Sequence, residues 1–263
     1  MRRIFILLFI LYGLPLALIQ VQAHAQPQAP AASAVIATAS NFQPAMKDLV
    51  KVFHAQQPHQ LVISAASSGV LFNQISQGAP FDVLLSADTS YPKKVGQQGL
   101  GDDSSRFTYA LGQLALVSHS DISNIDPKQY LAQLLNNKGR IAIANTATAP
   151  YGIAAQQALE TLQLWPVPPK QLISGSNVGQ AFQFVATKNT DVGFVALSQA
   201  QLLAQNSSLN FLTIPQAWYQ PIQQQAILLQ SGQHNPAALA FLAFLKTEQA
   251  KAIIQDHGYK LAN

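Results

Sequence analysis

The stretch AASSGVLFNQI (65–75) joins a strand pattern to a helical pattern. The apolar run LVIS (61–64) precedes it, and Leu71 and Ile75 then recur at the spacing of one helix face. Two serines and a glycine stand at the junction, and no lysine follows them. The junction therefore lacks the pattern of a phosphate-binding loop that ends in lysine, and its helix start offers neutral hydrogen-bond donors.

Similar short apolar runs alternate with helical patterns along most of the chain. AVIA (34–37) and FDVLLSA (81–87) are typical of buried strands, whereas the apolar residues from Phe42 to Phe53 are spaced four, three and four apart. Such alternation predicts an α/β fold whose sheets are mainly parallel. Ligands of these folds lie beyond the carboxyl ends of the strands, where the next helices begin.

The C-terminal region carries helix signals of its own. Asn235 followed by Pro236 predicts a helix start, with an N-cap and then proline in the first turn. Thr247 predicts the start of a final helix, and Gly258 its end. The segment 213–225 is polar and interrupted by prolines, so it is predicted to cross between two lobes of the molecule.

Four strand-to-helix junctions are rich in small and hydroxyl residues: TASNF (38–42), AASSGV (65–70), APYGI (149–153) and SGSNVG (174–179). A helix start presents unpaired N–H groups and about half a positive charge. Several converging starts would bind an anion without any cationic side chain. The same residue types are also ordinary helix caps, so each junction by itself fits either a cap or part of a binding site.

The first 25 residues differ from the rest of the chain. Two arginines precede an apolar run over 4–19, and small residues follow at Ala23 and Ala25. This order is that of a secretory signal peptide, residues 1–25, cleaved after Ala25 or alternatively after Ala23. Residues 26–33, rich in Gln, Ala and Pro, are then expected to form a flexible lead-in to a secreted protein.

Composition argues against several classes of protein. The formal charge of +4 comes from 15 basic and 11 acidic residues, and the basic residues are scattered, so no nucleic-acid partner is expected. There is no cysteine, which removes disulfide and thiol chemistry. The sequence has no G-x-S-x-G elbow, and its histidines lack metal-ligand spacing. We therefore predict no catalytic residue, no cofactor and no metal ligand.

The segment SSGVLFNQISQGAPFDVLLSAD (67–88) resembles the S-S-x-x-L-x-x-Q-I-x-x-G-A-P-x-D-V-x-x-S-A-D segment of the periplasmic molybdate-binding proteins of ABC importers. Further segments resemble that family: ATASNFQPAM (37–46), APYGIAAQQAL (149–159), NVGQAFQFV (177–185), DVGFVALSQA (191–200) and KTEQAKAIIQDHGY (246–259). The resemblance covers 35–258. It implies a soluble, monomeric periplasmic protein that binds molybdate, and tungstate as well, and delivers it to an ABC transporter permease. It also implies that the protein is not an enzyme.

The family resemblance implies a two-lobed periplasmic binding protein fold of type II. Its two α/β lobes are joined by two crossing strands, and the oxyanion binds in the cleft between them. Carried onto this chain, lobe one comprises 34–110 and 224–263, and lobe two comprises 111–223.

The family's ligand positions fall on the helix starts described above. In lobe one, Ser40 and Ser68 match positions that hold oxygens through a hydroxyl and a backbone N–H. In lobe two, Tyr151 and Val178 match positions that donate backbone N–H groups. The resemblance thus implies a molybdate site made of hydrogen-bond donors.

One departure concerns a side-chain donor. Many family members carry a tyrosine in the segment that reads GFVALS here, and the position is occupied by Ala196. A buried dianion that lacks one hydrogen bond would lose about 1.5–3 kcal/mol. We therefore expect Asn41 and the phenol of Tyr151 to replace the missing donor, a pattern that resembles a second subgroup of the family.

Two other functions stay open at this point. Sulfate, like molybdate, carries no proton at neutral pH, so a pocket of pure donors fits either anion. Protonated phosphate would need an acceptor carboxylate, and none lies at the four junctions. A secreted hydrolase is the more distant alternative, and it would need a histidine beside one of Ser40, Ser67 and Ser68.

Overall fold

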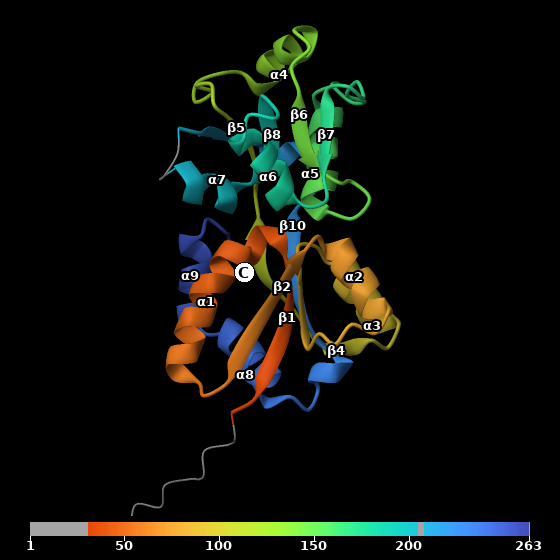
Figure 1. The fold of residues 1–263 in the computed structure, drawn as a ribbon, viewed down its shortest axis with the longest axis vertical. Coiled ribbons are helices and arrows are strands. Elements are labelled where there is room, and N and C mark those ends of the chain that lie inside the picture. The colour runs from red at the N-terminus through yellow and green to blue at the C-terminus, as the bar shows by residue number, and fades with distance from the viewer. Residues whose placement is uncertain (1–30, 205–207, 263) are drawn as a thin grey trace, which may run out of the picture. The chain divides into compact units, whose positions relative to one another are not determined.

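The computed structural model of the protein describes residues 31–204 and 208–262, so the predicted signal peptide (1–25) and residues 26–30 of the lead-in lie outside the described residues. Two five-stranded sheets organise the described chain (Figure 1). The sheet of lobe one has the order β2-β1-β3-β10-β4, with β1 (Ser33–Ala39), β2 (Gln60–Ala66), β3 (Val83–Ser86), β4 (Gly101–Gly112) and β10 (Ile222–Leu229). That of lobe two has the order β7-β6-β8-β5-β9, with β5 (Leu114–Ser118), β6 (Ile141–Ala144), β7 (Leu172–Gly175), β8 (Val192–Ala196) and β9 (Asn210–Thr213).

Helices flank both sheets. Lobe one carries α1 (Gln43–Gln56), α2 (Ser68–Ser76), α3 (Ser90–Gln97), α8 (Pro236–Leu245) and α9 (Glu248–Asp256), with the short 3₁₀ turns η1 (Ser40–Phe42) and η3 (Gln230–Gly232). Lobe two carries α4 (Pro127–Asn136), α5 (Pro150–Thr161), α6 (Val178–Ala186) and α7 (Leu197–Ala204), with the turn η2 (Gln216–Trp218) before the return to lobe one. Both lobes belong to one compact unit, Ala31–Asn263.

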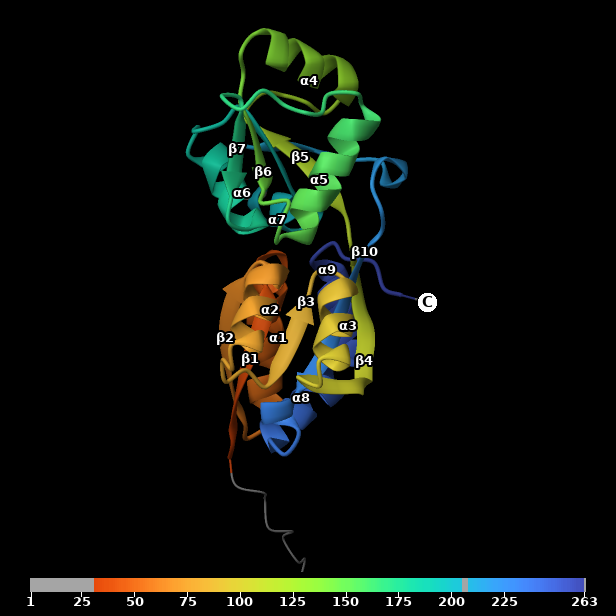
Figure 2. The same ribbon diagram turned by 90° about the vertical axis from the view of Figure 1, so that its right-hand side faces the viewer.

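Each sheet is mainly parallel in direction, with one strand, β10 or β5, that runs against the other four. In lobe one, β1 pairs parallel with β2 and β3, whereas β10 pairs antiparallel with β3 and β4. Lobe two repeats this, with β6 parallel to β7 and β8, and β5 antiparallel to β8 and β9. The two-lobed α/β fold is confirmed. The antiparallel strands β5 and β10 are the first strands after each passage between lobes (Figure 2). They enter from the carboxyl edge of the parallel strands and must therefore run against them.

The core of lobe one follows from side-chain alternation along buried strands. In β3, Val83 and Leu85 pack with apolar residues of α1, α8 and α9, whereas Leu84 packs on the other face with α2 and α3. The strand is therefore apolar from Val83 to Leu85, as a sheet covered on both faces requires. This arrangement explains why FDVLLSA is so easily identified as a strand from sequence.

The helix starts predicted near the C-terminus are confirmed. The Oδ1 of Asn235 accepts a hydrogen bond from the N–H of Ala237 at 3.0 Å, and Pro236 is the first residue of α8. The Oγ1 of Thr247 accepts from the N–H of Ala250 at 3.2 Å and caps α9. Gly258 follows this helix with a φ of +79°, a conformation that glycine adopts without steric cost.

Strand β4 is an element that the sequence pattern does not predict. Its residues read GDDSSRFTYALG, and many of them are partly exposed because β4 lies at the edge of its sheet. Helix α5 spans Pro150–Thr161 and so starts at the proline. Within the described ranges, every helix is too short or too polar to cross a membrane.

Asp82 should be a stability determinant of lobe one. Its carboxylate accepts hydrogen bonds from the backbone N–H of Val35 at 2.7 Å and from the Nδ2 of Asn235 at 3.1 Å. Asp82→Ala leaves that part-buried N–H unpaired, so the free energy of unfolding should fall by about 1.5–3 kcal/mol in urea denaturation. The control Asp121→Ala, in an exposed turn, should change it by less than about 0.5 kcal/mol. An equal effect of the two substitutions would contradict this role.

Candidate functional site

The four predicted helix starts meet around one small cavity. It holds about 180 Å³ of atom-free space, part of which is open to solvent, and it is lined by Ala39, Ser40, Asn41, Ser67, Ser68, Ala87, Ala149, Pro150, Tyr151 and Val178. All five residues predicted to bind a ligand are in this set. The first six lining residues belong to lobe one and the last four to lobe two, so the cavity lies between the lobes.

The backbone explains why these residues converge. Ser40 and Asn41 form η1 at the end of β1, and Ser68 is the first residue of α2. In lobe two, Tyr151 lies in the first turn of α5, and Val178 is the first residue of α6. Because first-turn N–H groups have no partner within their own helix, the cavity is surrounded by backbone donors.

Ser68 is oriented by a backbone contact. Its side chain is fully buried, and its Oγ accepts a hydrogen bond from the N–H of Ala87 at 2.9 Å. The hydroxyl hydrogen is then available to another acceptor, which is what an anion in the cavity would provide. Beside it, the Oγ of Ser67 is buried without a hydrogen-bond partner. The sequence prediction did not include Ser67 among the anion ligands.

A buried polar network lies behind Asn41 and Tyr151. The Nδ2 of Asn41 donates to the Oε1 of Gln224 at 2.9 Å and to the hydroxyl of Tyr259 at 3.1 Å. The hydroxyl of Tyr109 also donates to that Oε1, at 3.0 Å. The Nε2 of Gln224 faces the hydroxyl of Tyr151 at 3.5 Å. Gln224 therefore connects a residue of lobe one to a residue of lobe two.

The phenols of this network remain neutral donors at physiological pH. Burial raises the pKa of Tyr259 to about 12. It raises the pKa of Tyr109 and of Tyr151 well above the usual value for tyrosine, helped by the neighbouring phenols. Each hydroxyl therefore has one hydrogen to give, and the hydrogen bonds of the network can be counted on that basis.

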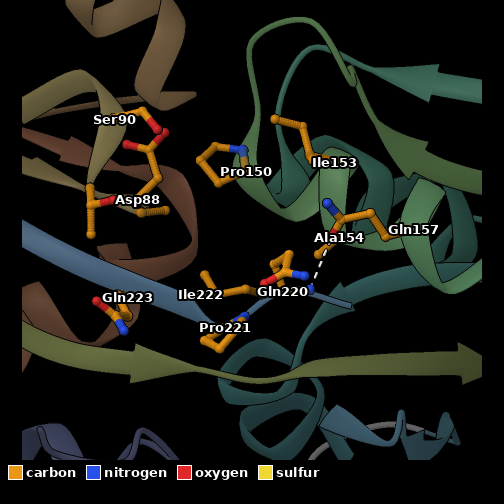
Figure 3. Close-up of a pocket in the computed structure, with 12 residues that line it drawn as sticks. Asp88, Ser90, Pro150, Ile153, Ala154, Gln157, Gln220, Pro221, Ile222 and Gln223 are labelled. Atoms are coloured by element: carbon orange, nitrogen blue, oxygen red, sulfur yellow. Dashed lines mark hydrogen bonds between the residues drawn. The ribbon is translucent and has the colours of Figure 1, made fainter. Parts of the chain in front are cut away.

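No charged side chain lines the cavity in the described part of the chain. The nearest acidic residue in sequence is Asp88, which lines an adjoining hollow with about 980 Å³ of atom-free space together with Pro150 and Gln220 (Figure 3). Burial raises the pKa of Asp88, although hydrogen bonds from Ser86 and Tyr91 and the charge of Lys94 act in the opposite direction. The cavity can therefore discriminate between ligands only by the geometry of its hydrogen-bond donors and by the size of the ligand.

The lobes touch directly beside the cavity. The N–H of Gly69, in the first turn of α2, donates to the carbonyl oxygen of Thr148 in lobe two at 2.8 Å. A Cβ on Gly69 would lie 2.9 Å from both the Cα and the oxygen of Thr148 and 2.5 Å from the hydroxyl of Tyr91. Glycine is thus required here because two backbones approach each other.

The structure also bears on the alternatives. Ala196 is fully buried at the end of β8 and supplies no side-chain donor to the cavity. Among the described residues, no histidine lines the cavity beside Ser40, Ser67 or Ser68. The described chain holds no group of three His, Cys, Asp or Glu side chains arranged to bind a metal ion.

Gln224 is the main site residue that sequence reasoning missed, together with its partners Tyr109 and Tyr259. Gln224 is fully buried although it stands in the polar run QQQ (223–225). The only available signal was its position two residues from the buried Ile222, on the same face of a strand. A polar residue on that face indicates a buried hydrogen-bond network.

The fold and the site define a class of protein: a two-lobed receptor that encloses a small ligand between its lobes. Residues 34–260 match the family of bacterial extracellular solute-binding proteins, and the chain belongs to that family. Its relatives include the molybdate-binding protein ModA of Rhodobacter capsulatus, which is 39% identical over 231 residues, 88% of this chain and 89% of the relative. ModA of Azotobacter vinelandii is 39% identical over 233 residues, 89% of this chain and 92% of the relative.

A solved structure agrees with these sequence relatives. The periplasmic molybdate-binding protein of Azotobacter vinelandii is 36% identical in the aligned region and superposes with a TM-score of 0.80. The alignment covers 88% of this chain and 100% of that structure. The family resemblance inferred from the sequence motifs is thereby confirmed.

Gly69→Ala should keep the lobes apart. The added methyl group meets backbone atoms of Thr148 that cannot move without separating the lobes. In small-angle X-ray scattering with saturating molybdate as the probe, the radius of gyration should exceed that of the wild type. The unliganded variant should remain folded, because alanine is favourable inside a helix.

Gly179→Ala is the matched control, since Gly179 also lies in the first turn of a helix beside the cleft. Its Cβ would have the Oδ1 of Asn177 at 3.1 Å and no backbone atom among its nearest neighbours. This variant should scatter like the wild type. A Gly69→Ala protein that closes to the same radius would show that the contact with Thr148 does not limit closure.

Proposed function

We propose that this protein binds molybdate, and also tungstate, in the periplasm and delivers it to the permease of an ABC transporter. One observation carries the proposal: helix starts from both lobes surround a small cavity with uncharged donors. The relatives named as molybdate-binding proteins match along nearly their whole length. Ser40, Asn41, Ser68, Tyr151 and Val178 are the proposed ligand residues.

The chemistry of the cavity fits a fully deprotonated oxyanion. Backbone N–H and hydroxyl groups donate to all sides, and the lining includes no carboxylate that would accept a hydrogen from the ligand. A dianion that has lost its hydration shell would accept hydrogen bonds from these donors in place of those from water, and the helix dipoles add to this stabilisation. Binding and delivery need no covalent step, so the protein acts as a receptor and not as an enzyme.

Lobe closure connects binding to delivery. The anion has donors on both lobes, and these can act together only when the lobes are close. The same approach forms the contact between Gly69 and Thr148. The closed, loaded form would be the one that a permease distinguishes from the empty protein. We infer that the mature protein, lobe one (34–110 and 224–263) and lobe two (111–223), acts as a monomer.

Calorimetric titration of the protein starting at Gln26 tests the substrate. Molybdate should bind one-to-one and tightly, whereas sulfate should bind at least about tenfold more weakly, because a smaller tetrahedral anion leaves donors unsatisfied. Tight sulfate binding with weak molybdate binding would preserve the fold assignment and overturn the substrate. Absence of heat with either anion would indicate that the four helix starts are plain caps.

Ser68→Ala should weaken molybdate binding by at least about tenfold, because a hydroxyl hydrogen bond to a charged ligand is lost. Ser40→Ala should also weaken molybdate binding. Both are measured by titration, with thermal unfolding of the unliganded proteins to confirm folding. Ser76→Ala, at the exposed end of the same helix α2, should bind like the wild type. Unchanged affinity in Ser68→Ala would remove this hydroxyl from the site.

A further inference from the structure

We propose that Gln224 is a positioning residue that allows only one of two neighbouring side chains, the Tyr151 phenol or the Asn41 amide, to donate a hydrogen to the bound anion. This inference rests on the proposed oxyanion binding. It concerns how the replacement for the absent tyrosine at position 196 is made. Gln224 itself lies outside the set of residues that line the cavity.

In the observed arrangement, both amide hydrogens of Asn41 are engaged. The Oε1 of Gln224 accepts from the amide of Asn41 at 2.9 Å and from the hydroxyl of Tyr109 at 3.0 Å. Asn41 has only two amide hydrogens, and the second goes to the hydroxyl of Tyr259 at 3.1 Å. With both hydrogens engaged, the Asn41 side chain has none left for an anion.

The other end of Gln224 has the opposite effect. Its Nε2 lies 3.5 Å from the hydroxyl of Tyr151 and can only donate. The phenol oxygen of Tyr151 therefore accepts this hydrogen bond, and no acceptor in the described chain takes the phenol hydrogen. In this arrangement the available donor is Tyr151, which is buried and lines the cavity.

A second arrangement uses the same positions of the heavy atoms. The nitrogen and oxygen of an amide have nearly the same shape, so Asn41 and Gln224 can both turn over. The Nε2 of Gln224 then donates to Asn41 and to Tyr109, whose own hydrogen goes to the carbonyl oxygen of Ser86 at 3.3 Å. The hydrogen of Tyr259, which bonds the carbonyl oxygen of Asn41 at 2.9 Å, can serve either oxygen of that residue.

In this second arrangement the donor roles are exchanged. The Oε1 of Gln224 faces Tyr151 and takes the phenol hydrogen, while the amide hydrogens of Asn41 become free. Turning over only one of the two amides would place two oxygens or two nitrogens 2.9 Å apart and is unfavourable. The two amides therefore turn together, and one donor is gained as the other is lost.

The location of Gln224 suits this role. It stands on β10, the strand by which the chain returns from lobe two, and a register shift in the pairing with β4 follows it directly. A Cβ on Gly112 would lie within 2.9 Å of the Nε2 of Gln224 and closer still to the hydroxyl of Tyr151. The absence of a side chain at Gly112 thus leaves room for both groups to meet at the crossing.

A double-mutant cycle with molybdate titration tests the proposal. If the two donors are alternatives, Tyr151→Phe and Asn41→Ala should each weaken binding by less than about threefold, because the other donor takes over. The double variant should bind at least about tenfold more weakly than the product of the two single losses, since no donor of this pair then remains. Two single losses that simply multiply would overturn the proposal.

The same cycle in a Gln224→Met background measures the coupling between the Tyr151 and Asn41 substitutions. A purely structural role of Gln224 would leave this coupling unchanged. Methionine has a similar length but cannot orient either neighbour by hydrogen bonding. Both side chains can then donate together, so each single substitution should weaken molybdate binding more than it does in the wild-type background. The loss of affinity in the double variant should equal the product of the two single losses within about twofold. The control is the exposed neighbour Gln223, and Gln223→Met should retain the coupling of the wild type. Coupling that persists in Gln224→Met would overturn the role of Gln224.

A wild-type protein that binds no molybdate would overturn the proposed function before any variant is made, and this inference with it. Folding of each variant is checked by thermal unfolding, with Asn41→Leu as the replacement should Asn41→Ala not fold. The wild-type cycle does not involve Gln224→Met and therefore decides the exchange of donors even if that variant is unstable.

Discussion

The structure depends on the convergence of helix N-termini from two separate sheets. Unpaired first-turn N–H groups are weak individually and cannot be moved independently of their helices. To surround one small cavity with them, α2 and α5 must start at the same place from opposite lobes, as they do at Ser68 and Pro150. The carboxyl ends of the parallel strands face each other across the cleft for this reason.

Other features follow from this geometry. Because β5 and β10 enter their sheets from the cleft, they run antiparallel to the strands beside them, and both sheets become mixed. Because the backbones of the two lobes approach within a hydrogen bond, a glycine is required at position 69. The crossing strands must also pass directly behind the cavity, which brings Gln224 next to the proposed ligand residues.

An uncharged cavity makes the direction of each hydrogen bond important. A lysine or arginine would attract an oxyanion in almost any orientation, whereas an amide or hydroxyl can present either a hydrogen or a lone pair. Ser68 is oriented by the N–H of Ala87, which occupies its oxygen and leaves its hydrogen free. The network of Gln224 performs the same task for Asn41 and Tyr151, at the cost of burying several polar groups that must all be satisfied.

Sequence by itself determined the local features of this protein: buried strands such as 81–87, the capped helix start at Asn235, and the four junctions with unpaired donors. These depend on neighbours within a few residues, and family motifs at the same junctions indicated which residues line the cavity. Tertiary structure alone decided the direction of β5 and β10, the edge strand β4, the need for glycine at position 69, and the partners of Gln224. Each of these arises from a contact between segments far apart in the chain, such as Asn41 with Gln224. Such contacts leave little local periodicity in the residues that make them.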